Sequence, residues 1–165
     1  FHEAYLADDA LPGGVVLGGE GQGWSVAMAT TGSERGLTLR SPGRFLATAA
    51  RLIDLYRSDP QPRLRERLAE AWMRAEAYRL FTLDTVTRLA GGAVMGADSS
   101  LNKVWWSELD VELHEIALEL LGPGAEVEGP WSKGWQFSLS GPIYAGTNEI
   151  QRNIAAERVL GLPRK

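Results

Sequence analysis

The residues best suited to chemistry lie near the end of the chain, in the string Tyr144-Ala145-Gly146-Thr147-Asn148-Glu149-Ile150-Gln151-Arg152. Gly146 and Thr147 form a hinge ahead of a short helix, and the Thr147 hydroxyl can accept a hydrogen bond from a helix-start amide. Glu149 falls in the first turn, where a negative charge suits the helix dipole. Spacing alone therefore predicts a capped amphipathic helix that closes a bundle.

The composition excludes several kinds of reactive site. The chain has 165 residues and no cysteine, so disulfides and thiolate chemistry are excluded. Its two histidines, His2 and His114, are too few and too isolated for a zinc site, and we expect His114 to be a boundary or surface residue. The net charge of −4 gives no electrostatic reason to bind nucleic acid or an anionic membrane.

The length corresponds to one domain, with 44% apolar and 23% charged residues, as is ordinary for a globular chain. No apolar run approaches the length of a membrane span and no signal peptide is visible, so we expect a cytoplasmic protein. The first residue is Phe1 rather than an initiator methionine, so we expect a piece of a longer protein.

Apolar residues recur at helical spacing in three long segments. The first runs from about residue 25 to 56, and we expect a break near residues 39–41 because Pro42 follows. The second is expected to begin with Asp59 as its cap and Pro60 as its first helical residue, since proline needs no partner for an N–H there.

The third segment begins at Asp98, a candidate cap, and ends at Gly122. Residues 125–141 are then expected to form a long loop with aromatic side chains, ahead of the last helix from Thr147. Short connections favour antiparallel neighbours. The pattern therefore predicts an all-α, up-down four-helix bundle, preceded by a short extended N-terminal segment.

A glycine-rich run, Gly18-Gly19-Glu20-Gly21-Gln22-Gly23-Trp24, is the remaining motif that could hold a ligand. Glycines ahead of a helix can cradle phosphate. This run lacks the lysine and serine of a P-loop, and no strand-helix-strand unit surrounds it. A flexible interdomain turn is the better interpretation.

The closing string closely resembles the C-terminal signature of acyl-CoA dehydrogenases, in which Tyr-x-Gly-Thr-x-x-Ile-x-Arg precedes the last helix. The glycine run resembles the Gly-Glu-x-x-Gly-Trp segment that joins their middle β-domain to their C-terminal helices. The resemblance implies that residues 1–20 are the end of a middle β-domain with its linker, and residues 21–165 a C-terminal helical bundle. It also implies that residues 1–165 alone are inactive, because the other domains hold most of the flavin and CoA surface.

The implied reaction is FAD-dependent α,β-dehydrogenation of an acyl-CoA thioester, in fatty-acid or related side-chain β-oxidation. In the family a glutamate takes the α-proton while the flavin takes the β-hydride. Many members carry that glutamate where this chain has Ala145, which cannot take a proton. A subset that includes isovaleryl- and long-chain-type enzymes carries it on the first helix of this domain, before an arginine. The matching pair here is Glu34-Arg35, so the resemblance implies Glu34 as the base; without it, Glu34 is an ordinary exposed carboxylate.

The resemblance also implies roles for other residues and molecules. Gly146, Thr147 and Glu149 would contact the cofactor, and Arg35 and Tyr144 the substrate. The implied partners are an acyl-CoA, an electron-transfer flavoprotein or equivalent acceptor, and further subunits in a homo- or hetero-oligomer.

Two strings depart from the family pattern. Arg57-Ser58-Asp59-Pro60 stands where an Arg-x-x-Phe-Gly string reaches the flavin of a neighbouring subunit, and Glu119-Leu120-Leu121-Gly122-Pro123 replaces Gln-x-x-Gly-Gly. An alternative therefore stays open, a non-catalytic structural subunit of a heteromeric acyl-CoA dehydrogenase. Trp105-Trp106 and residues 131–137 could lie in an interface or fold back on their own bundle.

Overall fold

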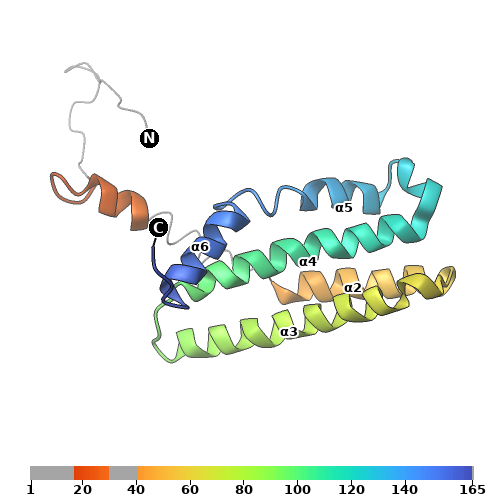
Figure 1. The fold of residues 1–165 in the computed structure, drawn as a ribbon, viewed down its shortest axis with the longest axis horizontal. Coiled ribbons are helices and arrows are strands. Elements are labelled where there is room, and N and C mark those ends of the chain that lie inside the picture. The colour runs from red at the N-terminus through yellow and green to blue at the C-terminus, as the bar shows by residue number, and fades with distance from the viewer. Residues whose placement is uncertain (1–16, 30–40, 165) are drawn as a thin grey trace, which may run out of the picture. The chain divides into compact units, whose positions relative to one another are not determined.

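The computed structural model describes residues 17–29 and 41–164 (Figure 1). The chain divides into two compact units, Phe1–Ser33 and Glu34–Lys165. The regular structure of the described residues is entirely helical. It comprises a helix over residues 23–29, α2 (Pro42–Ser58), η1 (Pro62–Leu64), α3 (Arg65–Ala90), α4 (Asp98–Leu121), η2 (Gly122–Glu126), α5 (Pro130–Ser138) and α6 (Asn148–Arg158).

In the first unit, the glycine-rich run forms a turn, as predicted. The Gln22 amide donates to the Gly19 carbonyl over 3.0 Å, and the Gly19 amide donates to the Gln22 Oε1 over 3.1 Å. Gly18 and Gly21 have φ of 80° and 76°, a conformation that glycine adopts without strain. The helix over residues 23–29 follows directly.

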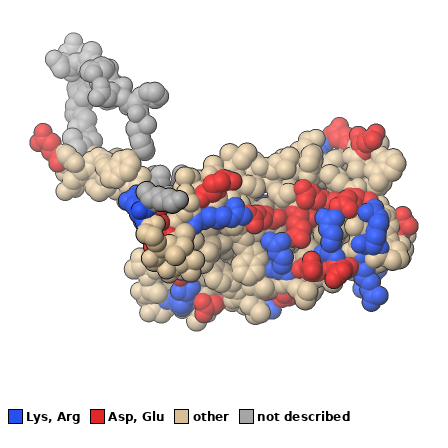
Figure 2. Space-filling model, in the orientation of Figure 1, with Lys and Arg blue, Asp and Glu red and all other residues tan. Residues whose placement is uncertain are grey.

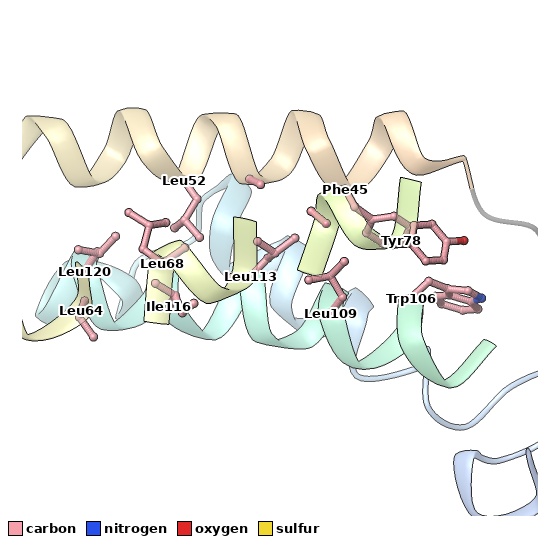
Figure 3. Close-up of a cluster of buried hydrophobic side chains, with 14 residues drawn as sticks. Phe45, Leu52, Leu64, Leu68, Tyr78, Trp106, Leu109, Leu113, Ile116 and Leu120 are labelled. Carbon is pink, nitrogen blue, oxygen red and sulfur yellow. The ribbon is translucent and has the colours of Figure 1, made fainter. Parts of the chain in front are cut away.

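In the second unit, α2, α3 and α4 lie side by side, and α5 and α6 cover α4 in the fourth position of the bundle (Figure 1). The core lies where the three long helices meet (Figure 3). Phe45 of α2 and Tyr78 of α3 meet edge-on there, with ring centroids 5.3 Å apart. Each fully buried side chain of this size contributes about 2 kcal/mol through apolar burial. The predicted all-α, up-down bundle is confirmed.

Ion pairs join α3 and α4 along their exposed seam, where Figure 2 shows acidic and basic side chains side by side. Arg67 pairs with Glu119, and Arg74 pairs with Glu112. Exposed pairs of this kind contribute about 1 kcal/mol or less. They help to set the register of the two helices, while the apolar core supplies most of the stability.

Two predicted helix starts are wrong. Asp59 is the C-cap of α2, and Pro62, rather than Pro60, opens the short η1 that leads into α3. Both prolines suit a first helical position, so composition alone did not decide between them. Asp98 is the first residue of α4 and not its cap, although its charge still suits the helix start.

The predicted long loop over residues 125–141 is also wrong, because this stretch contains η2 and the nine-residue helix α5. Pro130 opens α5, where its missing N–H needs no partner. The Trp131 ring lies under the Arg51 guanidinium of α2, 5.4 Å from ring centroid to Cζ. Tertiary packing on α2 and α4 therefore stabilises a helix that its internal glycine and its short length disfavour.

Helix α4 carries a buried polar stripe beside its apolar face. The side chains of this stripe recur at alternating spacings of about three and four residues, and each residue is at most 5% exposed. They are Ser100, Lys103, Ser107, Asp110 and His114. Since α5 and α6 pack on α4, the polar stripe is covered by the end of the chain.

Candidate functional site

The candidate site is the turn that leads into α6. Ala145 and Gly146 both have positive φ, 56° and 86°, so the chain reverses sharply there. Thr147 caps α6, since its hydroxyl accepts a hydrogen bond from the Ile150 amide at 3.5 Å. The predicted cap is confirmed, and the turn is closed further by the Asn148 amide, which donates to the Pro142 carbonyl over 2.9 Å.

Gln151 supports this turn from inside the protein. Its side chain is fully buried and its Nε2 donates to the Ala145 carbonyl over 3.1 Å. A Cβ atom at Gly146 would lie 2.5 Å from the same Nε2. Gly146 is therefore required twice, once for its backbone conformation and once for the close approach of Gln151.

A polar network fastens α6 to α4. The Lys103 Nζ donates to the Asn148 Oδ1 over 2.7 Å, and the Ser107 hydroxyl donates to the same oxygen over 3.1 Å. The Asn148 Nδ2 donates to the Glu108 Oε1 over 3.2 Å, and Arg152 bonds the same carboxylate. Cation, amide, carboxylate and guanidinium thus follow one another from the core to the surface.

Two charged groups near the turn have shifted pKa values. Burial lowers the pKa of the Lys103 ammonium, although the charges of Glu149 and Glu108 oppose this effect. The pKa of the exposed Glu149 carboxyl is lowered, first by the hydrogen bond from its own backbone amide and then by the Thr147 hydroxyl. Glu149 is therefore an anion held at the N-terminus of its own helix.

The ring of Tyr144 packs against the bundle. Its centroid lies 5.8 Å from that of Trp106, with the planes 39° apart, and Trp106 itself is buried in the core. Tyr144 is half-buried. Its ring therefore ties the start of the turn to α4.

The structure brings four of the predicted site residues together in this one turn, namely Tyr144, Gly146, Thr147 and Glu149. The predicted base Glu34 and its neighbour Arg35 lie outside the described residues. Their assignment stays a prediction.

Sequence reasoning missed the residues that hold the turn in place, Lys103, Ser107, Asn148 and Gln151. A usable signal was present in α4, because polar residues recur at helical spacing beside its apolar face. The expectation that His114 lies at a boundary or on the surface is wrong. This residue belongs to the buried polar stripe of α4 and is 5% exposed. Its Nδ1 donates to the Asp110 carbonyl over 2.7 Å, as in a satisfied structural histidine.

The turn presents backbone, a hydroxyl and a fixed carboxylate to a ligand. In the described ranges no group of three or more His, Cys, Asp or Glu side chains could hold a metal ion. Among the same residues, no helix has the length and apolar character needed to cross a membrane. The Glu149 carboxylate at this turn can accept hydrogen bonds from hydroxyl or N–H groups.

Comparison with known proteins gives this fold and site a family. The profile described as "Acyl-CoA dehydrogenase, C-terminal domain" matches residues 21–160. The chain is 37% identical over 174 residues to acyl-CoA dehydrogenase IpdE1 of Mycolicibacterium smegmatis, an alignment that covers 100% of this chain and 43% of that protein. It is 36% identical over 176 residues to IpdE1 of Mycobacterium tuberculosis, covering 100% of this chain and 45% of that protein.

Solved structures share the fold. The Tcur3481-Tcur3483 steroid ACAD superposes with a TM-score of 0.73 at 22% identity, covering 87% of this chain and 40% of that chain. Butyryl-CoA dehydrogenase from Megasphaera elsdenii superposes with a TM-score of 0.67 at 21% identity, with 87% and 40% covered. The chain belongs to the acyl-CoA dehydrogenase family, and it spans less than half the length of the curated relatives described above.

Proposed function

We propose that this chain is the C-terminal domain of an FAD-dependent acyl-CoA dehydrogenase that oxidises the α,β bond of an acyl-CoA thioester. The family assignment supports the class of reaction. An electron-transfer flavoprotein or an equivalent acceptor would take up the electrons.

One observation carries the proposal, the division of the closing signature into two faces. Asn148 and Gln151 are buried and fasten the segment to the bundle, while Gly146, Glu149 and Ile150 are exposed beside them. Any amphipathic helix that closes a bundle has an exposed face, but here that face begins with a positive-φ backbone turn and carries an exposed carboxylate with a lowered pKa. The exposed face offers a backbone turn and a fixed anion, both suited to contact a ligand.

The exposed face fits part of a flavin nucleotide. Glu149 already supplies the negative charge that the positive end of α6 attracts, so this end disfavours a phosphate. Its carboxylate can instead accept hydrogen bonds from hydroxyl or N–H groups, which a flavin nucleotide carries. We therefore assign Gly146, Thr147 and Glu149 to the donor-rich, uncharged part of FAD, whose isoalloxazine would supply the hydride chemistry when bound.

The α-proton needs a base other than Glu149. A carboxyl with a lowered pKa is a weak proton acceptor, whereas a general base works best with a pKa near the working pH. Ala145 has no proton-accepting group. These two facts leave the base to another residue, and the resemblance to the alternative-base members of the family assigns that role to Glu34, with Arg35 and Tyr144 beside the acyl-CoA.

We also propose that the full-length protein is an oligomer. Trp105 and Trp106 pack within their own bundle, since Trp106 is buried in the core and Trp105 stacks on Phe81 with centroids 5.9 Å apart. Exposed apolar side chains lie instead on α3, where Met73 and Leu80 are 59% and 57% exposed. This outer face of α3 is the surface that we assign to a neighbouring subunit.

The test uses the full-length protein, purified with its flavin and assayed by dye reduction with a panel of acyl-CoA substrates. We expect Glu34→Gln to lower the rate at least about a hundredfold while FAD stays bound. The matched control is Glu115→Gln, which removes a charge from an exposed position on α4 and should leave the rate unchanged. Near-normal turnover in Glu34→Gln would show that the base lies elsewhere.

A second experiment tests whether side chains at positions 34 and 145 can both reach the α-carbon of the substrate. We expect Ala145→Glu to restore part of the activity in the Glu34→Gln background. The left-handed backbone at Ala145 is already tolerated with a side chain, so a longer one adds little backbone strain. If activity does not recover while FAD stays bound, a side chain at position 145 does not reach the carbon atom that Glu34 acts on.

The alternative is a structural subunit that completes a site on a catalytic partner. One observation favours it: Glu119, where the family has glutamine, is held by both Arg63 and Arg67. Arg57 likewise pairs with Asp54 on its own helix over 3.3 Å. Co-purification with a second, motif-complete subunit would support this alternative, whereas flavin binding by the parent protein alone would count against it.

A further inference from the structure

Lys103 is a buried charge that the proposed chemistry does not use. It lies on α4 and is 2% exposed, and its ammonium donates a hydrogen bond to the Asn148 Oδ1. In the described part of the chain no carboxylate forms an ion pair with its ammonium, and Glu149 and Glu108 act on it only through space. Burial of such a group costs stability, so packing alone would be better served by an apolar side chain of similar length.

We propose that Lys103 is a positioning residue, which fixes the side-chain amide of Asn148 and thereby the turn from Thr147 to Glu149. The consequence for FAD rests on the proposed function. The positioning itself concerns only residues of this chain and can be measured without the cofactor.

The hydrogen bonds around Asn148 define its amide orientation. Its oxygen faces two donors, Lys103 and Ser107, while its nitrogen faces the Glu108 carboxylate. A flipped amide would bring the nitrogen against the ammonium and the oxygen against the carboxylate. The buried positive charge therefore selects one orientation, and a charge-assisted hydrogen bond holds it more strongly than a neutral one.

Asn148 transmits this constraint to the turn. It is the first residue of α6, and its backbone amide donates to the Pro142 carbonyl over 2.9 Å. Thr147 and Glu149 are its direct neighbours in the chain. A loosened Asn148 side chain would therefore loosen the cap and the carboxylate together.

The charge of Lys103 also favours the ionised form of Glu149. Arg152 and Lys103 both lower the Glu149 pKa through their charges, after the larger hydrogen-bond effects of its own amide and of Thr147. Lys103 acts from inside the protein and Arg152 from the surface. Lys103 thus combines a geometric and an electrostatic effect on the same turn.

The experiment compares Lys103→Met and Lys103→Gln in the full-length protein, with Lys133→Met as the matched control. Lys133 is an exposed lysine on α5 whose side chain is 66% exposed. Amide hydrogen exchange of residues 145–150 is measured in the apoprotein, together with the FAD dissociation constant and the thermal unfolding midpoint.

We expect Lys103→Met to raise the amide exchange rate at residues 145–150 about tenfold. It should also raise the FAD dissociation constant about tenfold, since this is the scale of one charge-assisted hydrogen bond. The unfolding midpoint should stay equal or rise, because a buried charge is removed. Lys103→Gln keeps an N–H donor and should recover most of both losses. Lys133→Met should change none of the three quantities.

A double-mutant cycle tests the route through Asn148. If Lys103 acts through this amide, Lys103→Met should add little to the effect of Asn148→Ala. Ser107→Ala removes the second donor to the same oxygen and should give a smaller effect in the same direction. If Lys103→Met fails to fold, Ser107→Ala still tests whether hydrogen bonds to the Asn148 Oδ1 hold the turn.

Unchanged exchange at residues 145–150 in Lys103→Met would overturn the proposal, and so would Lys103→Gln behaving like Lys103→Met. Additive effects in the cycle would equally overturn it. Failure of the proposed function is distinct, because the wild-type protein would then bind no FAD while the exchange measurements still report on the turn. Raised exchange without any FAD binding would leave the positioning role standing and refute the flavin role.

Discussion

A Cβ atom at Gly134 would lie 2.4 Å from the Nε2 of His114. The backbone of α5 thus rests directly on an imidazole ring of α4, closer than any side chain at Gly134 would allow. His114 is fixed in turn by its bond to the Asp110 carbonyl, and its ring meets the edge of Trp131 with centroids 5.7 Å apart. The ring has little room to move aside.

Gly134→Ala should therefore destabilise the protein by about 2 kcal/mol, since overpacking at a rigid contact outweighs the better helix propensity of alanine. Urea unfolding provides the measurement. Gly43→Ala is the control, because Gly43 is an exposed glycine of α2 whose added Cβ would meet only the Ser41 hydroxyl at 3.5 Å. A stable Gly134→Ala protein would show that α5 can shift on α4.

Ala145 adopts a left-handed backbone conformation, with φ of 56°. Such a conformation costs a residue with a Cβ atom about 1–2 kcal/mol, and glycine escapes this cost but loses more backbone entropy on folding. Ala145→Gly should therefore stabilise the protein by about 0.5 kcal/mol. Ala50→Gly, at an exposed position of α2, should destabilise it by about 1 kcal/mol. Changes of the same sign in both variants would contradict this account.

The Arg44 guanidinium pairs with the buried Asp110 carboxylate, Nη2 to Oδ2, over 2.6 Å. Arg44→Met removes this partner from a buried charge and should cost about 2 kcal/mol, less than for a fully buried pair because Arg44 is partly exposed. Arg57→Met on the same helix breaks an exposed pair with Asp54 and should cost less than about 0.5 kcal/mol. Chemical denaturation of both variants at one salt concentration gives the comparison.

The loss of unfolding free energy at acid pH should depend on Glu149. Its pKa is lower in the folded protein than in the unfolded chain, so the folded form binds its proton less tightly. This contribution is fully present above the ordinary glutamate pKa of about 4.3 and is lost as the pH falls through the folded value. Glu149→Gln should flatten the dependence of unfolding free energy on pH below about pH 5. An unchanged slope would show that the carboxylate is not held at the helix end.

Sequence patterns predicted the parts of this domain that local chemistry determines. Thr147 caps α6 because a hydroxyl ahead of an amphipathic segment has a direct use there, whatever surrounds it. The bundle architecture followed from helical periodicity and short connections. The start of α3 was misplaced because Pro60 and Pro62 satisfy the same local rule.

The parts that were missed depend on tertiary contacts. Residues 130–138 contain proline and glycine, which indicate a loop locally, yet they form α5 because that helix packs on α4. His114 was expected at a boundary or on the surface, because a polar stripe on a helix does not by itself show that α5 will cover it. The role of Lys103 depends on Asn148, 45 residues away, and the sequence could not pair these two positions.

The attachment of α6 gives the domain two levels of stability. The extensive packing of α6 is on α4, whereas α2, α3 and α4 all pack on one another. Detachment of α6 would remove the turn while the three-helix core stays intact. A ligand that binds only the docked turn would oppose that detachment by mass action, so its concentration would set how often α6 and the turn are open to proteases. Loss of the ligand would then speed proteolysis of α6 without changing the fold of the three-helix core.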